Sequence, residues 1–175
     1  MYSDFKLLAQ YNTWVNARLY ECAEQLDDKQ LKEDRGAFFR SVLATFNHIM
    51  VADLAWLRRF AKQSSSSENL QGLDQFPVPS ALTSILFEEW DELKAARQKL
   101  DAIIEEFAGS ITAAHTSNAL SYTNMKGIPA IKNVGDLLLH FFNHQTHHRG
   151  QITALLTQFG LETPDTDLLF LCQDA

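Results

Sequence analysis

Four long stretches of this sequence contain no proline and only two glycines, and together they cover most of the chain: residues 2–25, 37–62, 80–108 and 133–159. In the first stretch the apolar residues recur at steps of three, four and seven: Phe5, Leu8, Trp14, Val15, Leu19 and Cys22. This spacing is typical of an amphipathic helix with one buried face. We therefore expect an all-α fold in which four long helices form an up-and-down four-helix bundle.

Capping and turn residues predict where these helices begin and end. Ser80 is a suitable N-cap for the third helix. Asn133 is a suitable N-cap for the fourth helix, which we expect to end near Phe159, just before Gly160. A run of serines and two prolines within residues 64–79 predict a long crossover connection between the second and third helices.

The remaining connections have different compositions. Residues 27–36 are polar and are expected to link the first two helices. Residues 110–132 are rich in β-branched side chains and contain Lys126–Gly127, which can turn the chain. This composition predicts a small hairpin or an ordered loop before the last long helix. A short turn or helix around residues 167–171 is expected to close the chain.

The second and third helices should differ in their surroundings. Between Ser41 and Leu57 the only formally charged residue is Asp53, so we expect burial on more than one side, inside the bundle, at a subunit interface, or both. The third helix carries a charged side and should be the most solvent-exposed of the four: Glu88, Glu89, Glu92, Lys94, Arg97 and Lys99.

Composition limits the classes of protein that this chain can belong to. Its 175 residues, 46% apolar and 21% charged, fit one soluble domain over residues 1–175. A formal net charge of −7 opposes nucleic-acid binding, because no basic excess is available to neutralise phosphates. No apolar run approaches the roughly 20 residues that cross a bilayer, so we expect no membrane partner. The lack of a signal-peptide pattern and of a disulfide framework predicts a cytoplasmic protein.

Four of the six histidines crowd into the fourth predicted helix: His140, His144, His147 and His148. At about 100° of rotation per residue, His144 and His148 turn toward the apolar stripe of this helix, and the other two point farther away. His144 and His148 are four residues apart, so both can reach one ion. His140 and His148 are roughly 12 Å apart along the axis, too far to share an ion bound at about 2.0–2.1 Å.

Two imidazoles alone bind a metal weakly, so a third ligand would have to come from elsewhere. The candidates are His48 in the second helix and His115 in the segment before the fourth. Helical periodicity does not select His48, although small neighbours such as Ala44 and Ala52 would allow a close helix approach or a cavity. Imidazole ligands suit zinc, nickel, iron and copper.

The same residues also admit structural interpretations. Histidines on helices are often hydrogen-bonded and inert, and the chain lacks the His-Glu-x-x-His sequence that gives zincin proteases their general base. Asp53 is expected to pair with an arginine such as Arg149. Cys22 is expected to be a buried, inert thiol. Three asparagines are candidates for orienting a ligand or for bridging helices: Asn12, Asn16 and Asn47.

Several segments resemble the DinB (DNA-damage-inducible) family. The sequence NHQTHHRGQ at residues 143–151 is similar to the signature helix of that family, and NHIMVADLAWL at residues 47–57 is similar to its second helix. The segments YNTWVNARL at residues 11–19 and PDTDL at residues 164–168 look similar as well. The resemblance therefore covers almost the whole chain in order.

The resemblance implies an up-and-down four-helix bundle that is usually a homodimer. It also implies a divalent metal held by one histidine of the second helix and two of the fourth, which are His48, His144 and His148 here. His140 and His147 receive no role from it. Zinc or nickel is the expected ion, with iron and manganese as the alternatives.

The better-defined relatives in that family are thiol-S-transferases that use bacillithiol or mycothiol, and mycothiol-dependent isomerases. A metal held by three imidazoles would keep a coordination position open for a thiol or for water, so a metal-dependent enzyme of the thiol-S-transferase or hydrolase type is expected. The resemblance favours the thiol-S-transferase. Its expected partners are a small-molecule substrate and a low-molecular-weight thiol. The alternative is a non-catalytic stress-response helical bundle in which the metal is structural or adventitious. Despite the family name, the charge still opposes DNA binding.

Overall fold

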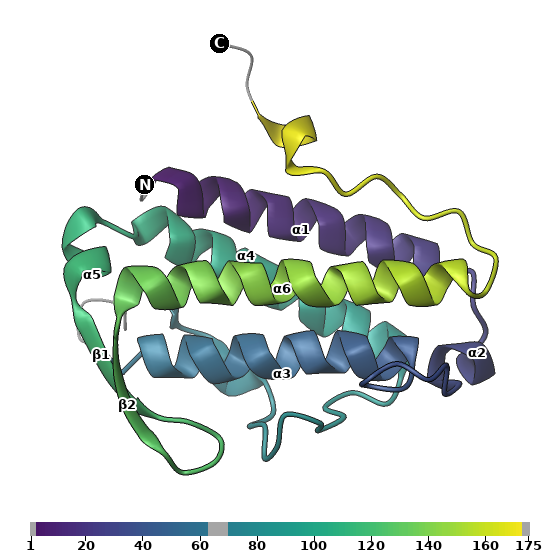
Figure 1. Cartoon of the computed structure of the whole chain (residues 1–175), viewed down its shortest axis with the longest axis horizontal. Helices are drawn as coiled ribbons and strands as arrows, with labels where there is room; N and C mark the ends of the chain where they lie inside the picture. Colours follow the sequence, from purple (N-terminus) through teal and green to yellow (C-terminus); the bar gives the residue numbers. More distant parts are fainter. Residues whose placement is uncertain (1–2, 63–69, 173–175) are drawn as a thin grey trace.

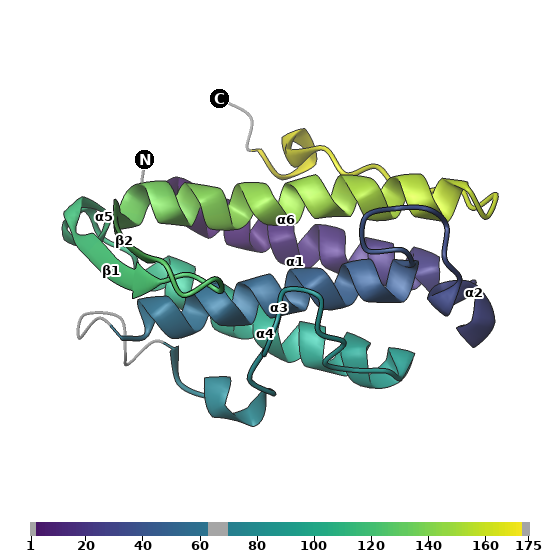
Figure 2. The same ribbon diagram turned by 60° about the horizontal axis from the view of Figure 1, so that its bottom comes forward.

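The computed structural model describes residues 3–62 and 70–172 (Figure 1). Most of them belong to four long helices that lie side by side in both views (Figure 2): α1 (Ser3–Ala23), α3 (Val42–Phe60), α4 (Trp90–Ser110) and α6 (Val134–Thr157). The prediction of a mostly helical chain is therefore confirmed. Tyr2 and residues 64–68, which include the serine run of the predicted crossover, lie outside the described residues.

The long helices do not alternate strictly in direction. Phe46 packs on Trp90 and Phe60 packs on Phe107, so α3 and α4 run the same way. Figure 1 shows α1 and α6 running together in the opposite direction. The up-and-down order predicted for all four helices is corrected in this respect. The physical reason is the length of the connection between α3 and α4, which is sufficient to return along the roughly 28 Å of α3.

The third long helix begins at Trp90 rather than directly after Ser80. The side chain of Asn47 on α3 explains the difference. Its Oδ1 accepts hydrogen bonds from the backbone N–H groups of Leu86 at 2.8 Å and Phe87 at 3.0 Å. Residues 72–89 are called the crossover segment from here on. Its N–H groups at residues 86 and 87 are bonded to α3, so these residues do not begin a helix.

The other predicted helix ends lie close to the observed ones. Ser41 caps α3 through the N–H of Ala44, so residues 37–41 form a turn before the helix. Asn133 caps α6 as predicted. Past Thr157 the chain ends its last turn with Gly160 at a φ of +79°, a left-handed conformation that glycine adopts without steric cost.

Small elements fill the connections. The segment between α1 and α3 contains the short helix α2 (Asp28–Lys32). The segment between α4 and α6 contains α5 (Ala113–Ser117) and an antiparallel hairpin of β1 (Ala119–Thr123) and β2 (Pro129–Asn133). A small hairpin is therefore present before α6. The described residues also include the 3-10 turns η2 (Leu73–Gln75) and η3 (Leu168–Leu171).

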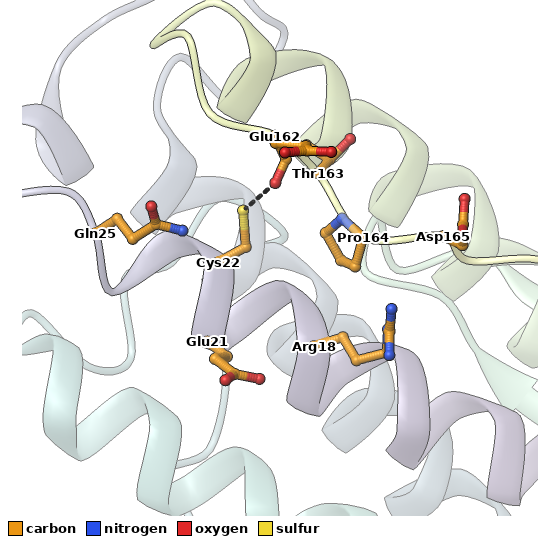
Figure 3. A pocket seen from close by; sticks show the side chains of 8 residues that line it. All are labelled: Arg18, Glu21, Cys22, Gln25, Glu162, Thr163, Pro164 and Asp165. Carbon is orange, nitrogen blue, oxygen red and sulfur yellow. Dashed lines mark hydrogen bonds between the residues drawn. The ribbon is translucent and has the colours of Figure 1, made fainter.

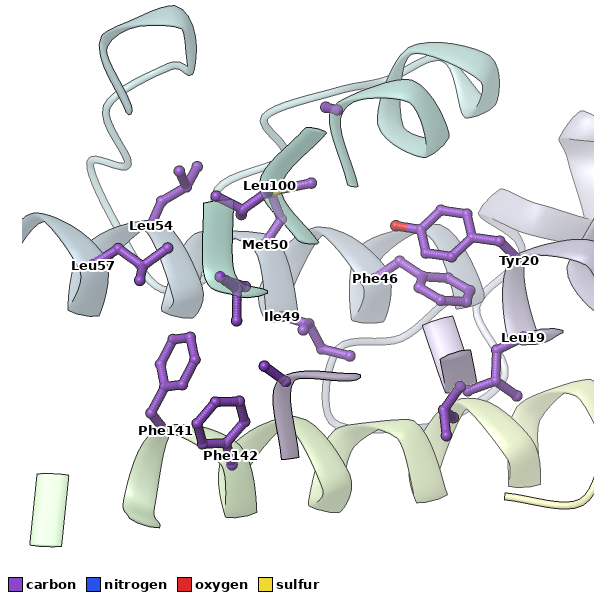
Figure 4. Close-up of a cluster of buried hydrophobic side chains, with 14 of the residues drawn as sticks. Leu19, Tyr20, Phe46, Ile49, Met50, Leu54, Leu57, Leu100, Phe141 and Phe142 are labelled. Atoms are coloured by element: carbon purple, nitrogen blue, oxygen red, sulfur yellow. The ribbon is translucent and has the colours of Figure 1, made fainter. Parts of the chain in front are cut away.

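One apolar core runs between the four long helices (Figure 4). Side chains such as Ile49 and Leu54 of α3 meet Leu100 of α4 and Phe141 of α6 there. The apolar surface of α3 is covered by α4, α6 and the crossover segment. Packing within one chain thus accounts for the apolar character of α3. No helix among the described residues is long and apolar enough to span a bilayer.

Candidate metal centre

Three of the histidines converge where α3 packs against α6. Nε2 of His144 lies 3.3 Å from Nε2 of His48 and 3.1 Å from Nε2 of His148. One ring nitrogen of each histidine lies within 4.8 Å of the others. Nitrogens bound tetrahedrally to one ion at about 2.0–2.1 Å are about 3.3 Å apart. The spacing of the three rings therefore fits a single metal ion with little rearrangement.

The crossover segment orients His48 through the ring nitrogen that does not face the other two histidines. Its backbone carbonyl at Leu82 lies 2.8 Å from Nδ1 of His48. A carbonyl oxygen can only accept, so Nδ1 carries the proton and Nε2 presents its lone pair to the cluster. Asn47, the neighbouring residue on α3, fixes the same segment through residues 86 and 87. The asparagine side chain thus helps to hold the carbonyl that orients the ring.

A glutamine orients His148 in the same manner. Oε1 of Gln151 lies 2.8 Å from Nδ1 of His148, one turn farther along α6. With that proton donated to the amide oxygen, Nε2 of His148 is also left as a lone-pair donor. Two of the three rings therefore turn an unprotonated nitrogen toward the position that an ion would take.

Phe39 covers one side of the cluster. Its ring stacks on His48 with centroids 3.8 Å apart and meets the edge of His148 at 5.4 Å. A tight turn presents this ring, with Gly36 at a φ of +75° and Arg40 at +71°. A left-handed conformation is uncommon for arginine and is typical of a site whose surroundings hold the backbone in place.

The remaining histidines lie outside the cluster. His115 belongs to α5, where its Nδ1 accepts from the N–H of Thr112 in a capping interaction, so it is not the third member. His147 is exposed on α6. His140 is exposed as well, and its ring lies 5.9 Å from that of His144.

Burial keeps the clustered imidazoles neutral. It lowers the pKa of His144 to about 3, with a further contribution from the charge that His148 would carry. It lowers the pKa of His148 to about 4, against the opposing effect of the Gln151 hydrogen bond. The pKa of His48 is lowered by burial too. Neutral imidazoles are the form that binds metal, so no proton has to leave before an ion enters at neutral pH.

The lowered pKa values predict that the metal-free protein loses stability in mild acid. The unfolded chain takes up protons on these histidines below about pH 6.5, whereas the folded chain does so only near pH 3 to 4. Between pH 7.5 and pH 5 we expect each of His144 and His148 to remove about 1 kcal/mol from the free energy of unfolding, after allowance for solvent access.

Urea unfolding of metal-free protein at the two pH values measures this loss. The double variant His144→Gln, His148→Gln provides the control, because it lacks both titrating groups. An equal pH dependence in the two proteins would contradict the assignment.

A buried polar network lies directly beneath the cluster. Asp53 of α3, 1% exposed, accepts from Nη1 of Arg97 at 2.6 Å and from Nε2 of Gln145 at 2.9 Å. Arg97 also pairs with Asp101 at 2.8 Å. Gln145 directly follows His144, so the network ties the histidine helix to α3 and, through Arg97, to α4.

Two expectations about this network are corrected. Asp53 pairs with Arg97, not with Arg149, because α4 runs parallel to α3 and places residue 97 opposite residue 53. Arg149 faces α1 instead and donates to Oδ1 of Asn12. Arg97 is only 3% exposed and does not belong to a solvated charged side of the third helix.

Asn12 and Asn16 bridge helices, whereas Asn47 links α3 to the crossover segment. Within the described part of the chain, none of the three forms a hydrogen bond with a clustered histidine. Nδ2 of Asn12 donates to Asp101 at 2.8 Å, and Nδ2 of Asn16 does so at 3.0 Å. Burial raises the pKa of Asp101, and the nearby Arg97 opposes that effect. The two asparagines therefore connect α1 to the buried ion pairs of α4.

Cys22 belongs to a different place in the fold. Its thiol, 6% exposed, donates to the carbonyl of Glu162 at 3.5 Å beside a cavity of about 590 Å³ (Figure 3). Burial raises the pKa of this thiol. None of the histidines lines that cavity. A thiol with a raised pKa is a poor nucleophile, as the sequence predicts.

Three contributors to the cluster are missed by sequence reasoning. Leu82 acts through its backbone carbonyl, which leaves no side-chain signal. Phe39 lies in a turn with no periodic pattern. Gln151 carries a usable signal, because a residue three positions after His148 lies on the same face of the helix.

Comparisons with known proteins agree on one family. The sequence profile of the DinB family matches residues 1–174. The chain is 26% identical to Protein DinB of Bacillus subtilis (strain 168) over 170 residues, which cover 94% of this chain and 92% of that protein. A crystal structure of a DinB-like protein from Bacillus cereus ATCC 10987 superposes with a TM-score of 0.62 at 19% identity, over 90% of this chain and 94% of the other. The latter similarity concerns the fold alone.

Proposed function

Because the chain belongs to the DinB family, we propose that His48, His144 and His148 hold one divalent metal ion, zinc or nickel, through their Nε2 atoms. We propose further that the protein is a metal-dependent enzyme of the thiol-S-transferase or hydrolase type that acts on a small molecule. The observation that carries this proposal is the convergence of the three rings, with nitrogen separations of 3.3 and 3.1 Å.

The orientation of the rings supports catalysis over a purely structural site. Leu82 and Gln151 hold the rings of His48 and His148, while Phe39 excludes water from one side. His144 stays partly exposed, so small molecules can approach from the other side. Three protein ligands with an accessible side are typical of catalytic sites, whereas structural sites are closed by four. A divalent ion bound there supplies Lewis acidity that lowers the pKa of water or of a thiol.

The thiol-S-transferase reaction is the one that the family resemblance favours. Neutral imidazoles are well suited to it, because they contribute no negative charge that would repel an incoming thiolate. The low pKa of His144 and of His148 keeps them in this neutral state throughout the physiological range.

Two further parts of the proposal concern assembly. We infer that the four long helices form a four-helix bundle, since α1 packs on α4 and α6 while α3 packs on α6 and α4. We also propose a homodimer in the cytoplasm, which rests on the family resemblance. Light scattering of the purified protein measures the oligomeric state, and a monomer at micromolar concentration would overturn the dimer.

Conjugation of a small thiol to an electrophile tests the proposed activity. We expect metal-loaded protein to accelerate the reaction of bacillithiol with monochlorobimane roughly a hundredfold over the uncatalysed rate, about 2.7 kcal/mol. The same protein stripped with a chelator should return to the uncatalysed rate. The reaction is repeated with mycothiol and with cysteine as the thiol, and ester hydrolysis is measured as well. If fully metal-loaded protein accelerates none of these reactions, the result supports the non-catalytic alternative.

A further inference from the structure

A second pocket lies beside the crossover segment and the hairpin, above the C-terminal half of α3. Its volume is about 250 Å³. Val78 and Pro79 of the crossover segment form one wall, and Tyr122 and Met125 from the hairpin side form another. Three separate parts of the chain thus enclose a space large enough for a small polar group.

Among the described residues, three cations and no acidic side chain line this pocket: Arg58, Arg59 and Lys62. This grouping contrasts with the whole chain, in which 22 acidic residues outnumber 15 basic ones. Asp74 acts electrostatically on Arg58 but does not line the pocket. The pocket is therefore a local positive site on a negatively charged protein, and it favours an anion.

The two arginines have different tasks. Nη2 of Arg58 donates to two backbone carbonyls of the crossover segment, at 3.0 and 2.9 Å, and so fixes one wall. The guanidinium of Arg59 lies over the rings of Trp56 at 4.6 Å and Tyr122 at 5.2 Å. Nη2 of Arg59 also donates to the backbone carbonyl of Thr123 at 3.5 Å. Stacking on two rings and this long hydrogen bond limit the movement of Arg59, and within the described residues its other planar donors remain for an oxyanion.

A row of aromatic rings connects this pocket to the three-histidine cluster. The ring centroids of Trp56 and His140 are 5.4 Å apart, and those of His140 and His144 are 5.9 Å apart. Each of these three side chains keeps some exposed surface. Along α3, Ala55 in the pocket lies seven residues from His48, roughly 10 Å at 1.5 Å per residue. One elongated small molecule can therefore span both places.

From this geometry we propose that the pocket binds the oxyanion end, a carboxylate or a phosphate, of an elongated small molecule whose other end reaches the histidine cluster. Arg59 and Lys62 donate to the oxyanion. Trp56 packs along the apolar middle of the ligand. The second half of this proposal rests on the proposed metal-dependent function, whereas the anion site itself does not need a metal.

The anion site is tested first in metal-free protein. Glutarate and inorganic phosphate are titrated separately while two-dimensional nitrogen-15 NMR follows the Arg59 Nε–H group and the amides of residues 121–123. We expect saturable shifts with at least one anion, and about tenfold weaker binding in Arg59→Gln and in Lys62→Gln. Lys99→Gln, an exposed lysine of α4, is the matched control and should bind like the wild type. The anion that binds more tightly identifies whether the charged end of the ligand is a carboxylate or a phosphate.

The connection to the cluster is tested in cobalt-loaded protein. Mercaptohexanoate and the equally long neutral mercaptohexanol are titrated while the thiolate-to-cobalt absorption band is recorded. We expect the acid to bind about tenfold more tightly than the alcohol, and this preference to disappear in Arg59→Gln and Lys62→Gln but not in Lys99→Gln.

The two titrations separate the two proposals. Anion binding by metal-free protein together with an absence of metal binding would leave the anion site standing and end the metal-dependent function. If neither anion shows saturable binding, or if Arg59→Gln and Lys62→Gln leave the binding unchanged, the anion site is overturned. Equal affinities for acid and alcohol in the cobalt protein would overturn the connection between the two sites.

Discussion

His144→Ala is expected to empty the metal centre, reducing the bound metal from about one divalent ion per chain to nearly none after dialysis. Nε2 of His144 is the nitrogen that lies closest to both of the others, at 3.3 and 3.1 Å. Loss of one imidazole from three should weaken binding by about 3 kcal/mol, or roughly a hundredfold. Inductively coupled plasma mass spectrometry of the dialysed protein measures the effect, and circular dichroism checks that the helices persist.

Two other histidines provide the controls for this loss. His148→Ala should lose metal in the same way, because it removes another of the three converging nitrogens. His115→Ala should keep the full amount, since His115 lies on α5 outside the cluster and takes part in the capping of that helix. Full metal retention in both His144→Ala and His148→Ala would end the metal-centre proposal.

Arg97→Met is expected to be the most destabilising single change in the buried network. Arg97 is 3% exposed and pairs with two buried carboxylates, Asp53 at 2.6 Å and Asp101 at 2.8 Å. Burial by itself would lower the pKa of Arg97, but Asp101 and Asp53 raise it above its usual range, so it remains a cation. Methionine fills a similar volume yet leaves both carboxylates uncompensated, at a cost of about 3–5 kcal/mol in the free energy of unfolding.

Denaturant unfolding at two pH values identifies the cause of that loss. Without the guanidinium, the pKa values of Asp53 and Asp101 should rise further, so protonation relieves the unpaired charge. The cost of Arg97→Met should therefore be smaller at pH 5 than at pH 8. Lys99→Met on the exposed side of α4 is the matched control and should change stability by no more than about 0.5 kcal/mol. A cost that does not depend on pH would indicate lost packing instead of unpaired charge.

The local features of the chain follow from its sequence. Helix periodicity requires only the constant rotation of about 100° per residue. The same rotation places His144 and His148 on the inner side of α6 without any knowledge of its neighbours. The N-cap at Asn133 and the left-handed Gly160 are equally local, because each depends on hydrogen bonds within a few residues.

Other features depend on which helices meet and in which direction. His48 lies opposite the main apolar stripe of its own helix, so periodicity does not distinguish it from His115 as a third ligand. The antiparallel packing of α3 on α6 brings His48 to the pair. In the same way, the parallel packing of α3 and α4 gives Asp53 the partner Arg97 instead of Arg149.

The sequence by itself determined the helical character of this chain, the two histidines of α6 that face inward and the caps of that helix, because each arises from interactions over about four residues. Only the tertiary structure decided the third histidine, the late start of α4 and the pocket that contains Arg59. These depend on contacts between segments far apart in the chain, such as the side chain of Asn47 with the backbone at residues 86 and 87. A pattern along one helix contains no information about the direction of the helix that packs against it.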